Sequence, residues 1–122
     1  MLKKLFLLSV AHAVGDMALR TFYIDAFKSP LSVGFGANGQ EIPFLWVYVL
    51  LAHALINGGC YYYTSGLLLV GLLETVSHFT IDYVSGVGYM PLIADQICHA
   101  LILFACALYW YSEDKYKNSV IH

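Results

Sequence analysis

The residues with the clearest capacity for chemistry are Glu74, His78 and Asp82, which lie four positions apart in an otherwise apolar segment. In an α-helix, residues four apart lie on one face, roughly 6 Å apart along the axis at about 1.5 Å of rise per residue. These three side chains are therefore expected to form one polar stripe. Carboxylate and imidazole groups in such an arrangement are typical of metal ligands and of residues that transfer protons.

The same spacing of four recurs in the other apolar segments of the chain. In each segment it separates a histidine from another polar residue, and the pairs are His12 and Asp16, His53 and Asn57, and Asp95 and His99. Each of the four segments thus supplies one histidine, and three of the four add at least one carboxylate.

The composition indicates an integral membrane protein. Hydrophobic residues make up 60% of the 122 residues and charged residues only 11%, whereas soluble domains have about 45–50% and about 25%. This length suits a single domain. The net charge is −2, with no basic run, so the sequence favours no nucleic-acid partner.

We expect residues 1–122 to form one all-α domain, a bundle of four transmembrane helices. Each apolar segment is close to the ~20 residues that cross about 30 Å of hydrocarbon. The expected helices cover about residues 3–24, 43–58, 65–84 and 91–111, with a loop at 25–42 and a fraying polar tail at 113–122.

Local signals set the expected boundaries of these segments. Pro43 suits the first turn of the second helix, and Gly58-Gly59 would end it, followed by an interfacial tyrosine cluster at residues 61–63. The glycines at 34, 36 and 39 match a dinucleotide-binding pattern, but that pattern requires a strand and a helix around it. We therefore expect a flexible loop with a turn at Asn38-Gly39.

The N-terminal segment has a second interpretation, since Lys3-Lys4, an apolar run and Ala11-His12-Ala13 also suit a signal peptide. Because the apolar run is short for such a peptide, we interpret it as the first membrane helix. An even number of spans puts both termini on one side of the membrane. Four lysines lie near the termini (Lys3, Lys4, Lys115 and Lys117), which predicts cytoplasmic termini.

This topology brings the polar residues of all four helices to similar depths. His12, His53 and Glu74 are expected near the middle of the membrane. The outer half would hold the remaining residues of the set, which are Asp16, His78, Asp82, Asp95 and His99. All eight could therefore meet in one polar pocket at the midplane or just outside it.

The energetic cost of burying these acids requires a compensating partner. A carboxylate at the centre of a membrane helix costs on the order of 2.5–3.5 kcal/mol. Four would cost roughly 10–14 kcal/mol, comparable with the ~5–15 kcal/mol that stabilises a whole domain. A bound divalent ion, worth about 10 kcal/mol or more, would be sufficient compensation. A proton or ion path, or a network of interhelical hydrogen bonds, would be the alternatives.

A metal site with one or two divalent ions is the favoured interpretation. The absence of thiolate pairs and the mixture of imidazole and carboxylate point to Zn²⁺, Mn²⁺ or Fe²⁺. Asn57 and Gln96 are expected to hydrogen-bond around the ligands, and Glu74 is the candidate general base. The expected metal ligands are His12, Asp16, His53, His78, Asp82, Asp95 and His99.

Over residues 5–105 the chain resembles a family of small bacterial and phage membrane proteins that is known as a domain of unknown function. The resembling motifs are His12-x-x-x-Asp16, the histidine of the second helix, His78-Phe79-x-x-Asp82 and Asp95-Gln96-x-x-His99. The chain departs from the family at Arg20, where glutamine is usual, and at Ser85, where lysine is usual. The resemblance implies four helices and a metal site in the bacterial inner membrane, without an established reaction.

The chain is also remotely similar to membrane proteins that are predicted to be metal-dependent hydrolases. The leading hypothesis is accordingly a hydrolase of a lipid or other amphiphilic phosphoester or ester, with membrane lipid as partner and a homo-oligomer left open. The alternatives are a non-catalytic protein of bacterial or phage origin, with an ion-handling, proton-handling or structural role, and a haem-binding bundle that uses two facing histidines.

Overall fold

The computed structural model describes residues 1–120 and confirms an all-α fold. Within these residues the chain forms five α-helices, one π-helical turn and a short two-stranded hairpin. In chain order the elements are α1 (Leu2–Ala13), η1 (Val14–Ala18), α2 (Phe22–Phe27), β1 (Gly34–Phe35), β2 (Glu41–Ile42), α3 (Leu45–Ser65), α4 (Leu68–Gly86) and α5 (Leu92–Val120).

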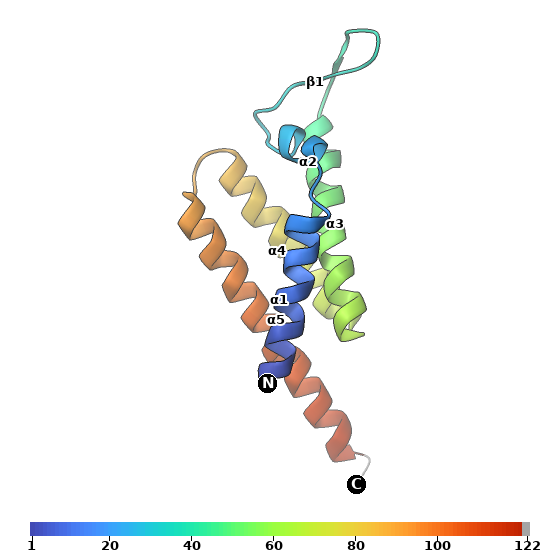
Figure 1. Ribbon diagram of the computed structural model, residues 1–122, viewed down its shortest axis with the longest axis vertical. Coiled ribbons are helices and arrows are strands. Elements are labelled where there is room, and N and C mark those ends of the chain that lie inside the picture. The colour runs from blue at the N-terminus through green and yellow to red at the C-terminus, as the bar shows by residue number, and fades with distance from the viewer. Residues whose placement is uncertain (121–122) are drawn as a thin grey trace.

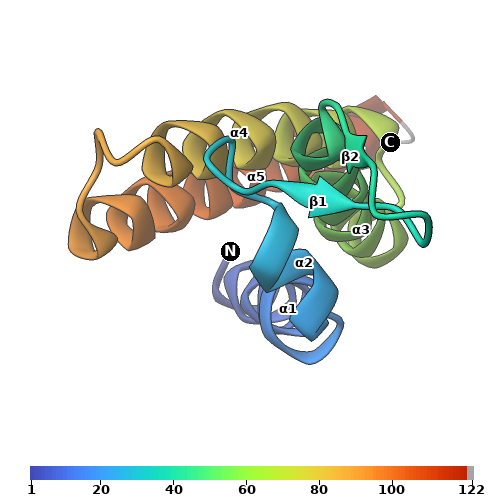
Figure 2. The same cartoon turned by 90° about the horizontal axis from the view of Figure 1, so that it is seen from above.

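The four longer helices form a closed ring. Helix α1 packs against α3, α3 against α4, α4 against α5, and α5 against α1. In Figure 1 the N-terminus and the end of α5 lie at the lower end of the molecule, while α2 and the hairpin lie at the upper end. Seen from above, α4 and α5 run side by side, and α1 covers a different side of the ring (Figure 2). The chain thus runs up and down, as the sequence predicted.

The first helix is interrupted where one continuous helix over 3–24 was expected. Helix α1 ends at Ala13, and the π-helical turn η1 continues it to Ala18. A separate helix, α2, begins after Thr21, whose hydroxyl accepts a hydrogen bond from the Ile24 amide at 3.3 Å. π-helical turns inside α-helices are frequent at functional sites, and this turn carries Asp16.

The segment expected as a loop over 25–42 contains α2 and a hairpin. Strands β1 and β2 pair antiparallel, with Gly34 opposite Ile42 and Phe35 opposite Glu41. Gly39 has a φ of 75°, in the left-handed region that glycine adopts without strain. The glycine pattern therefore makes a hairpin turn, which excludes the strand–helix setting of a dinucleotide-binding loop.

Helix α3 continues to Ser65, beyond the end expected at Gly58-Gly59. Gly58 is a contact point between helices: a Cβ atom there would lie 1.8 Å from Thr75 Oγ1 and 2.6 Å from the Gly71 carbonyl oxygen. The absence of a side chain lets α3 and α4 approach closely. The helix also begins later than expected, at Leu45, after Phe44 adopts a left-handed conformation with a φ of 59°.

Helix α5 is longer than the expected span of 91–111, because it runs without interruption to Val120. Most of the expected fraying tail is thus helical, while residues 121–122 of that tail lie outside the described residues. The extension contacts the N-terminus, where the Lys4 ammonium pairs with Asp114 and lies 4.1 Å from the ring centre of Trp110.

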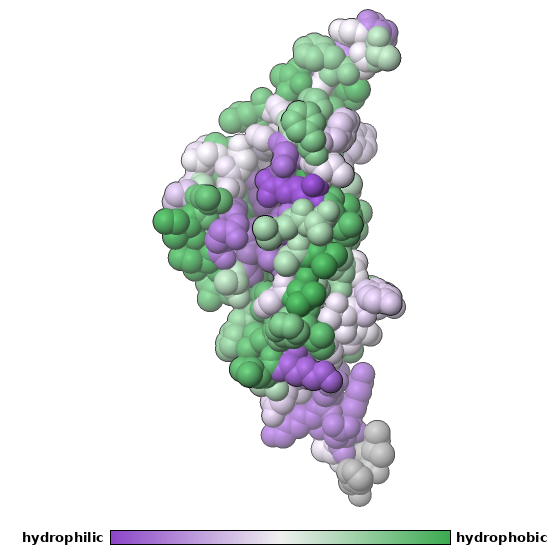
Figure 3. Space-filling view, viewed as in Figure 1, coloured by the Kyte–Doolittle hydropathy of each residue, from purple (hydrophilic) through white to green (hydrophobic). Residues whose placement is uncertain are grey.

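Large apolar side chains cover the outside of the ring. Phe6 of α1, Leu72 of α4 and Leu101 of α5 are 67%, 51% and 63% exposed. Figure 3 shows this hydrophobic surface, with hydrophilic residues in a hollow of the upper half and at the lower end. Among the described residues two helices, α3 and α5, are long and apolar enough to cross a membrane. Helix α1 has only 12 residues, and the polar stripe lowers the hydropathy of α4.

The interior is divided between an apolar and a polar part. The apolar part fills the end near the chain termini and includes Leu8, Tyr61, Val70 and Cys106. Above it lies a polar interior, and its buried members are His53, Asn57, Glu74, His78, Asp82, Asp95 and His99. A partly polar interior beneath large exposed apolar side chains departs from the pattern of soluble domains, which rarely bury charged residues.

Candidate metal centre

The structure brings all eight predicted histidines and carboxylates into one buried cluster. Helix α1 with η1 supplies His12 and Asp16, and α3 supplies His53. Helix α4 supplies the polar stripe, and α5 supplies Asp95 and His99. The side chains of the first pair are 18% and 13% exposed, and the other six are less exposed. The prediction from the spacing of four is correct on each helix, because both members of each pair face the centre of the ring.

Three atoms of Asp16, His53 and His78 form the tightest group. Asp16 Oδ1 lies 3.1 Å from His53 Nε2 and 3.7 Å from His78 Nε2, and the two nitrogens lie 3.2 Å apart. Ligands of one zinc ion lie about 2.0–2.2 Å from it, so two of them can be no more than about 4.4 Å apart. All three distances satisfy this limit. Two histidines and one carboxylate are a common ligand set for zinc and non-haem iron.

A second group consists of Asp82, Asp95 and His99. His99 Nε2 lies 3.4 Å from Asp82 Oδ1 and 3.9 Å from Asp95 Oδ2. One ligand atom from each of these three buried residues lies within 4.8 Å of the others. This second group could also hold a metal ion.

The carboxylate of Asp82 connects the two groups. Its Oδ1 atom faces His99, while its Oδ2 atom lies 3.6 Å from His53 Nε2 and 3.9 Å from His78 Nε2. One carboxylate thus offers an oxygen to each group. This is the arrangement of a bridging ligand in a site with two metal ions.

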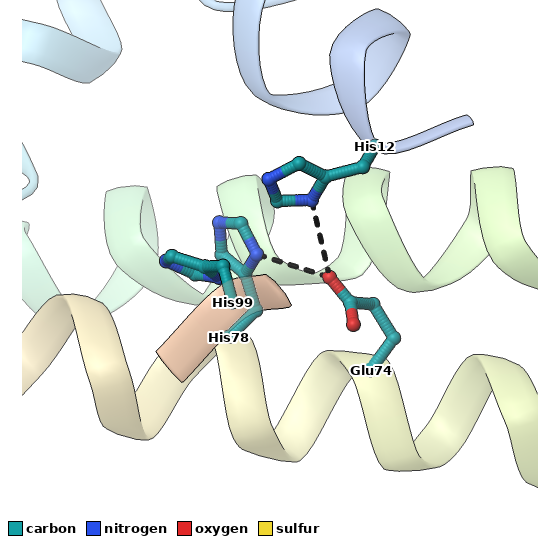
Figure 4. A group of neighbouring side chains, drawn as sticks. All are labelled: His12, Glu74, His78 and His99. Atoms are coloured by element: carbon teal, nitrogen blue, oxygen red, sulfur yellow. Dashed lines mark hydrogen bonds and ion pairs between the residues drawn. The ribbon is translucent and has the colours of Figure 1, made fainter. Parts of the chain in front are cut away.

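His12 and Glu74 form a further candidate group with His78 and His99, and one ligand atom from each of the four lies within 4.8 Å of the others (Figure 4). Glu74 Oε1 lies 3.2 Å from His78 Nδ1 and 3.7 Å from His12 Nδ1. An ionised carboxylate can only accept a hydrogen bond, so it holds the proton of His78 on Nδ1. The Nε2 atom of His78 then keeps its lone pair, which points at the group formed with Asp16 and His53.

Several buried atoms of the cluster have no hydrogen-bond partner among the described residues. They include His12 Nδ1, His53 Nδ1 and Asp95 Oδ1. A buried polar atom without a partner costs on the order of 1–3 kcal/mol, so a cluster with several of them is incomplete as a purely structural network. The donor types and their separations fit a divalent cation, and Asp95 Oδ1 is a free oxygen in the second group.

Asn57 and Gln96 lie beside the candidate ligands. The Asn57 amide nitrogen donates to the His53 carbonyl oxygen at 3.2 Å and lies 3.4 Å from His78 Nε2. The Gln96 amide donates to Asp95 Oδ2 at 3.0 Å. Gly15 makes room for Asn57, since a Cβ atom there would lie 2.4 Å from Asn57 Oδ1. Each amide thus contacts a candidate ligand.

Two residues of the site were not expected from the sequence. Lys28, in the segment expected as a loop, places its ammonium 2.7 Å from Asp82 Oδ2. No spacing rule connects it to α4, so the sequence offered no signal. Tyr61, expected at an interface, is fully buried, with its ring centre 6.4 Å from that of His12. It follows His53 by eight and Asn57 by four positions, and this periodicity could have placed it on the same helical face.

A polar cavity of about 210 Å³ opens from the cluster toward the end of the molecule that carries α2. Three candidate ligands line it: Asp16, Asp82 and Asp95. The remaining charged residues of its wall are Arg20, Asp25 and Lys28. A small molecule can therefore reach both ligand groups from this side.

No protein-family model, curated protein or solved structure matches this chain. The function must therefore be inferred from the side chains of the cluster and from the cavity beside it.

Proposed function

We propose that this protein is a metal-dependent hydrolase that acts within a membrane. The observation that carries the proposal is the joining of two ligand groups by Asp82 at the floor of an open polar cavity. Sites with two metal ions are typical of enzymes that hydrolyse phosphoesters, esters and peptides.

The proposal includes four membrane-spanning helices: α1 with η1, α3, α4 and α5. Its support is the apolar exterior of the ring and the two helices that already meet the length and hydropathy of a membrane span. A polar stripe is tolerated in such a helix when it faces a polar interior. The lysines near both termini favour a cytoplasmic location for that end. The bacterial inner membrane is the location that we propose, from the sequence motifs alone.

We assign one ion to Asp16, His53 and His78 and a second to Asp95 and His99, with Asp82 shared between the two ions and His12 near the first group. Zn²⁺, Mn²⁺ and Fe²⁺ match these nitrogen and oxygen donors. When bound, such ions activate water for attack and polarise the oxygen of the scissile bond.

The other polar side chains position the ligands and accept protons. Glu74 was expected as the general base, but its contact with His78 Nδ1 supports an orienting role, as carboxylates commonly play beside ligating histidines. One oxygen of a ligand is the better proton acceptor: Asp95 faces His99 with Oδ2, while its Oδ1 atom has no partner among residues 1–120 and its side chain lines the cavity. The apolar part of the interior excludes water from the terminal end of the ring.

The test is elemental analysis of the purified protein in detergent, before and after chelation, together with an assay against amphiphilic esters. We expect one or two metal equivalents, and we expect His78→Ala to lose metal and activity together. Ser77→Ala is the matched control. Ser77 is next to His78 in the chain, but its side chain lines an outer groove between α4 and α5 and not the cluster. Full metal content in the His78 variant would refute the proposal.

A non-catalytic proton-handling role is the second candidate. Its support is the continuous series of contacts from His12 through Glu74, His78 and Asp82 to the cavity. The apolar cluster lies at the other end of this series, so proton flux across the membrane would require a path past these side chains. Proton flux in liposomes without hydrolytic turnover would favour this candidate, and a Soret band in the purified protein would instead indicate haem.

A further inference from the structure

The cavity beside the ligand groups contains two cationic side chains, and each is paired with a carboxylate. Lys28 Nζ lies 2.7 Å from Asp82 Oδ2, and Arg20 pairs with Asp25. The Lys28 side chain is 20% exposed, whereas that of Asp82 is only 5% exposed. Lys28 therefore reaches inward from the cavity wall to a carboxylate that both candidate metal groups share.

The charge of the cavity depends on its metal content. Four carboxylates line it (Asp16, Asp25, Asp82 and Asp95), against the two cations Arg20 and Lys28. The metal-free wall thus has a formal charge of −2, which repels anions. Two divalent ions would change this to +2, the charge that a phosphate dianion would neutralise.

Metal binding would also release Lys28. The Oδ2 atom of Asp82 that accepts from Lys28 is the same oxygen that faces His53 and His78. A metal ion bound there would take the place of the ammonium as the partner of this oxygen. Lysine has a flexible stem of four carbons, so its ammonium can turn into the cavity and remain beside the site.

We propose that the cavity binds a phosphate group of the substrate, with Lys28 as its main recognition residue. Arg20 would be a second donor, because guanidinium groups match the oxygens of phosphate. The proposal rests on the proposed metal-dependent hydrolase and specifies its substrate class. Leu92 lines the same cavity and is 74% exposed, so an apolar chain attached to the phosphate has a surface to contact.

The binding test uses calorimetric titration of the full chain, metal-loaded, with inorganic phosphate and with a phosphatidic acid of short acyl chains. We expect Lys28→Gln to weaken phosphate binding about tenfold to a hundredfold, as for the loss of one hydrogen bond between charged groups. Lys28→Arg should retain most of the affinity, and Lys3→Gln, at the opposite end of the molecule, should bind as the wild type does. Metal content is measured on each sample.

The outcomes separate this inference from the proposed function. Metal in every variant with equal phosphate affinity in wild type and Lys28→Gln would overturn the inference alone. Lys28-dependent phosphate binding in a wild-type protein that holds no metal would keep Lys28 as a phosphate-binding residue, but it would refute both the release of Lys28 by a metal and the metal-dependent hydrolase. A wild type that binds neither metal nor phosphate would refute both.

The two probes identify the source of the phosphate group. Equal affinities would assign recognition to the phosphate alone, which is expected if a free phosphoester enters from the aqueous side. Tighter binding of the phosphatidic acid by about tenfold or more would assign a lipid headgroup, with its acyl chain on the surface at Leu92. Equal binding of acetate in place of phosphate would refute the phosphate class.

Discussion

At the scale of single residues, the central feature is a histidine with two different neighbours on its two nitrogens. His78 directs Nδ1 to Glu74 and Nε2 to Asp16 and His53. A carboxylate that holds the proton of one ring nitrogen fixes the ring orientation and makes the other nitrogen a better ligand. Glu74 is 2% exposed and also lies 3.7 Å from His12 Nδ1, so its contacts are with the histidines of the cluster.

Glu74→Gln tests this role. Replacing the carboxylate with an amide keeps the shape of the side chain but weakens its hold on the His78 proton. We expect the metal affinity to fall about tenfold to a hundredfold, measured by competition with a chelator of known affinity. Glu113→Gln, on the far part of α5, is the control and should leave affinity unchanged. An unchanged affinity in the Glu74 variant would remove the orienting role.

At the scale of the elements, glycines determine how closely the helices that bear these residues can pack. Gly58 of α3 faces Gly71 of α4, and each would place a Cβ atom within 2.8 Å of the backbone of the other helix. The His53 and His78 rings, on the same two helices, have centres only 4.9 Å apart. The separation of α3 and α4 therefore controls the geometry of the first ligand group.

Gly58→Ala is expected to destabilise the protein by about 1–3 kcal/mol, because the added methyl group collides with Thr75 and with backbone. Gly59→Ala is the matched control. A Cβ atom at Gly59 meets nothing within 4 Å in the described part of the chain, so alanine should stabilise the helix by about 0.5–1 kcal/mol. Denaturant unfolding in detergent measures both variants. Equal stability of the two would contradict close packing at Gly58.

At the scale of the whole molecule, polar side chains are concentrated inside the ring and apolar side chains on its outer surface. The cluster of acids and histidines lies within the ring, and large apolar side chains such as Phe6 and Leu101 cover the outside. The charged ends differ as well, since the end with the termini carries four lysines (Lys3, Lys4, Lys115 and Lys117) and the other end carries Arg20 and Lys28. A lipid bilayer around the ring would satisfy both distributions.

Labelling of introduced cysteines tests the proposed membrane topology. We expect Asn38→Cys, in the hairpin turn, to react with an impermeant thiol reagent applied from outside intact cells. Asn118→Cys, near the end of α5, should react only after the membrane is opened. The three native cysteines (Cys60, Cys98 and Cys106) are replaced by alanine in both proteins. Reaction of both introduced cysteines from the same side would contradict the topology.

Much of the helical fold and the members of the cluster could be predicted from the sequence. The fourfold spacing of His78 and Asp82, and of Asp95 and His99, depends only on helical periodicity, which is local. The ends of the helices were less predictable from the sequence. Gly58-Gly59 is a helix-ending signal by composition, but contact with α4 outweighs the roughly 1 kcal/mol cost of glycine within a helix.

What the sequence determined by itself was therefore the set of side chains on each helix and the need to compensate four buried acids. Only the tertiary structure decided how these side chains combine. In the structure the two oxygens of Asp82 face different ligand groups, and Glu74 contacts His78 Nδ1. Lys28, from a distant segment of the chain, contacts Asp82. These contacts depend on the distances between helices and on the path of a connecting segment. The periodicity of a single helix predicts neither.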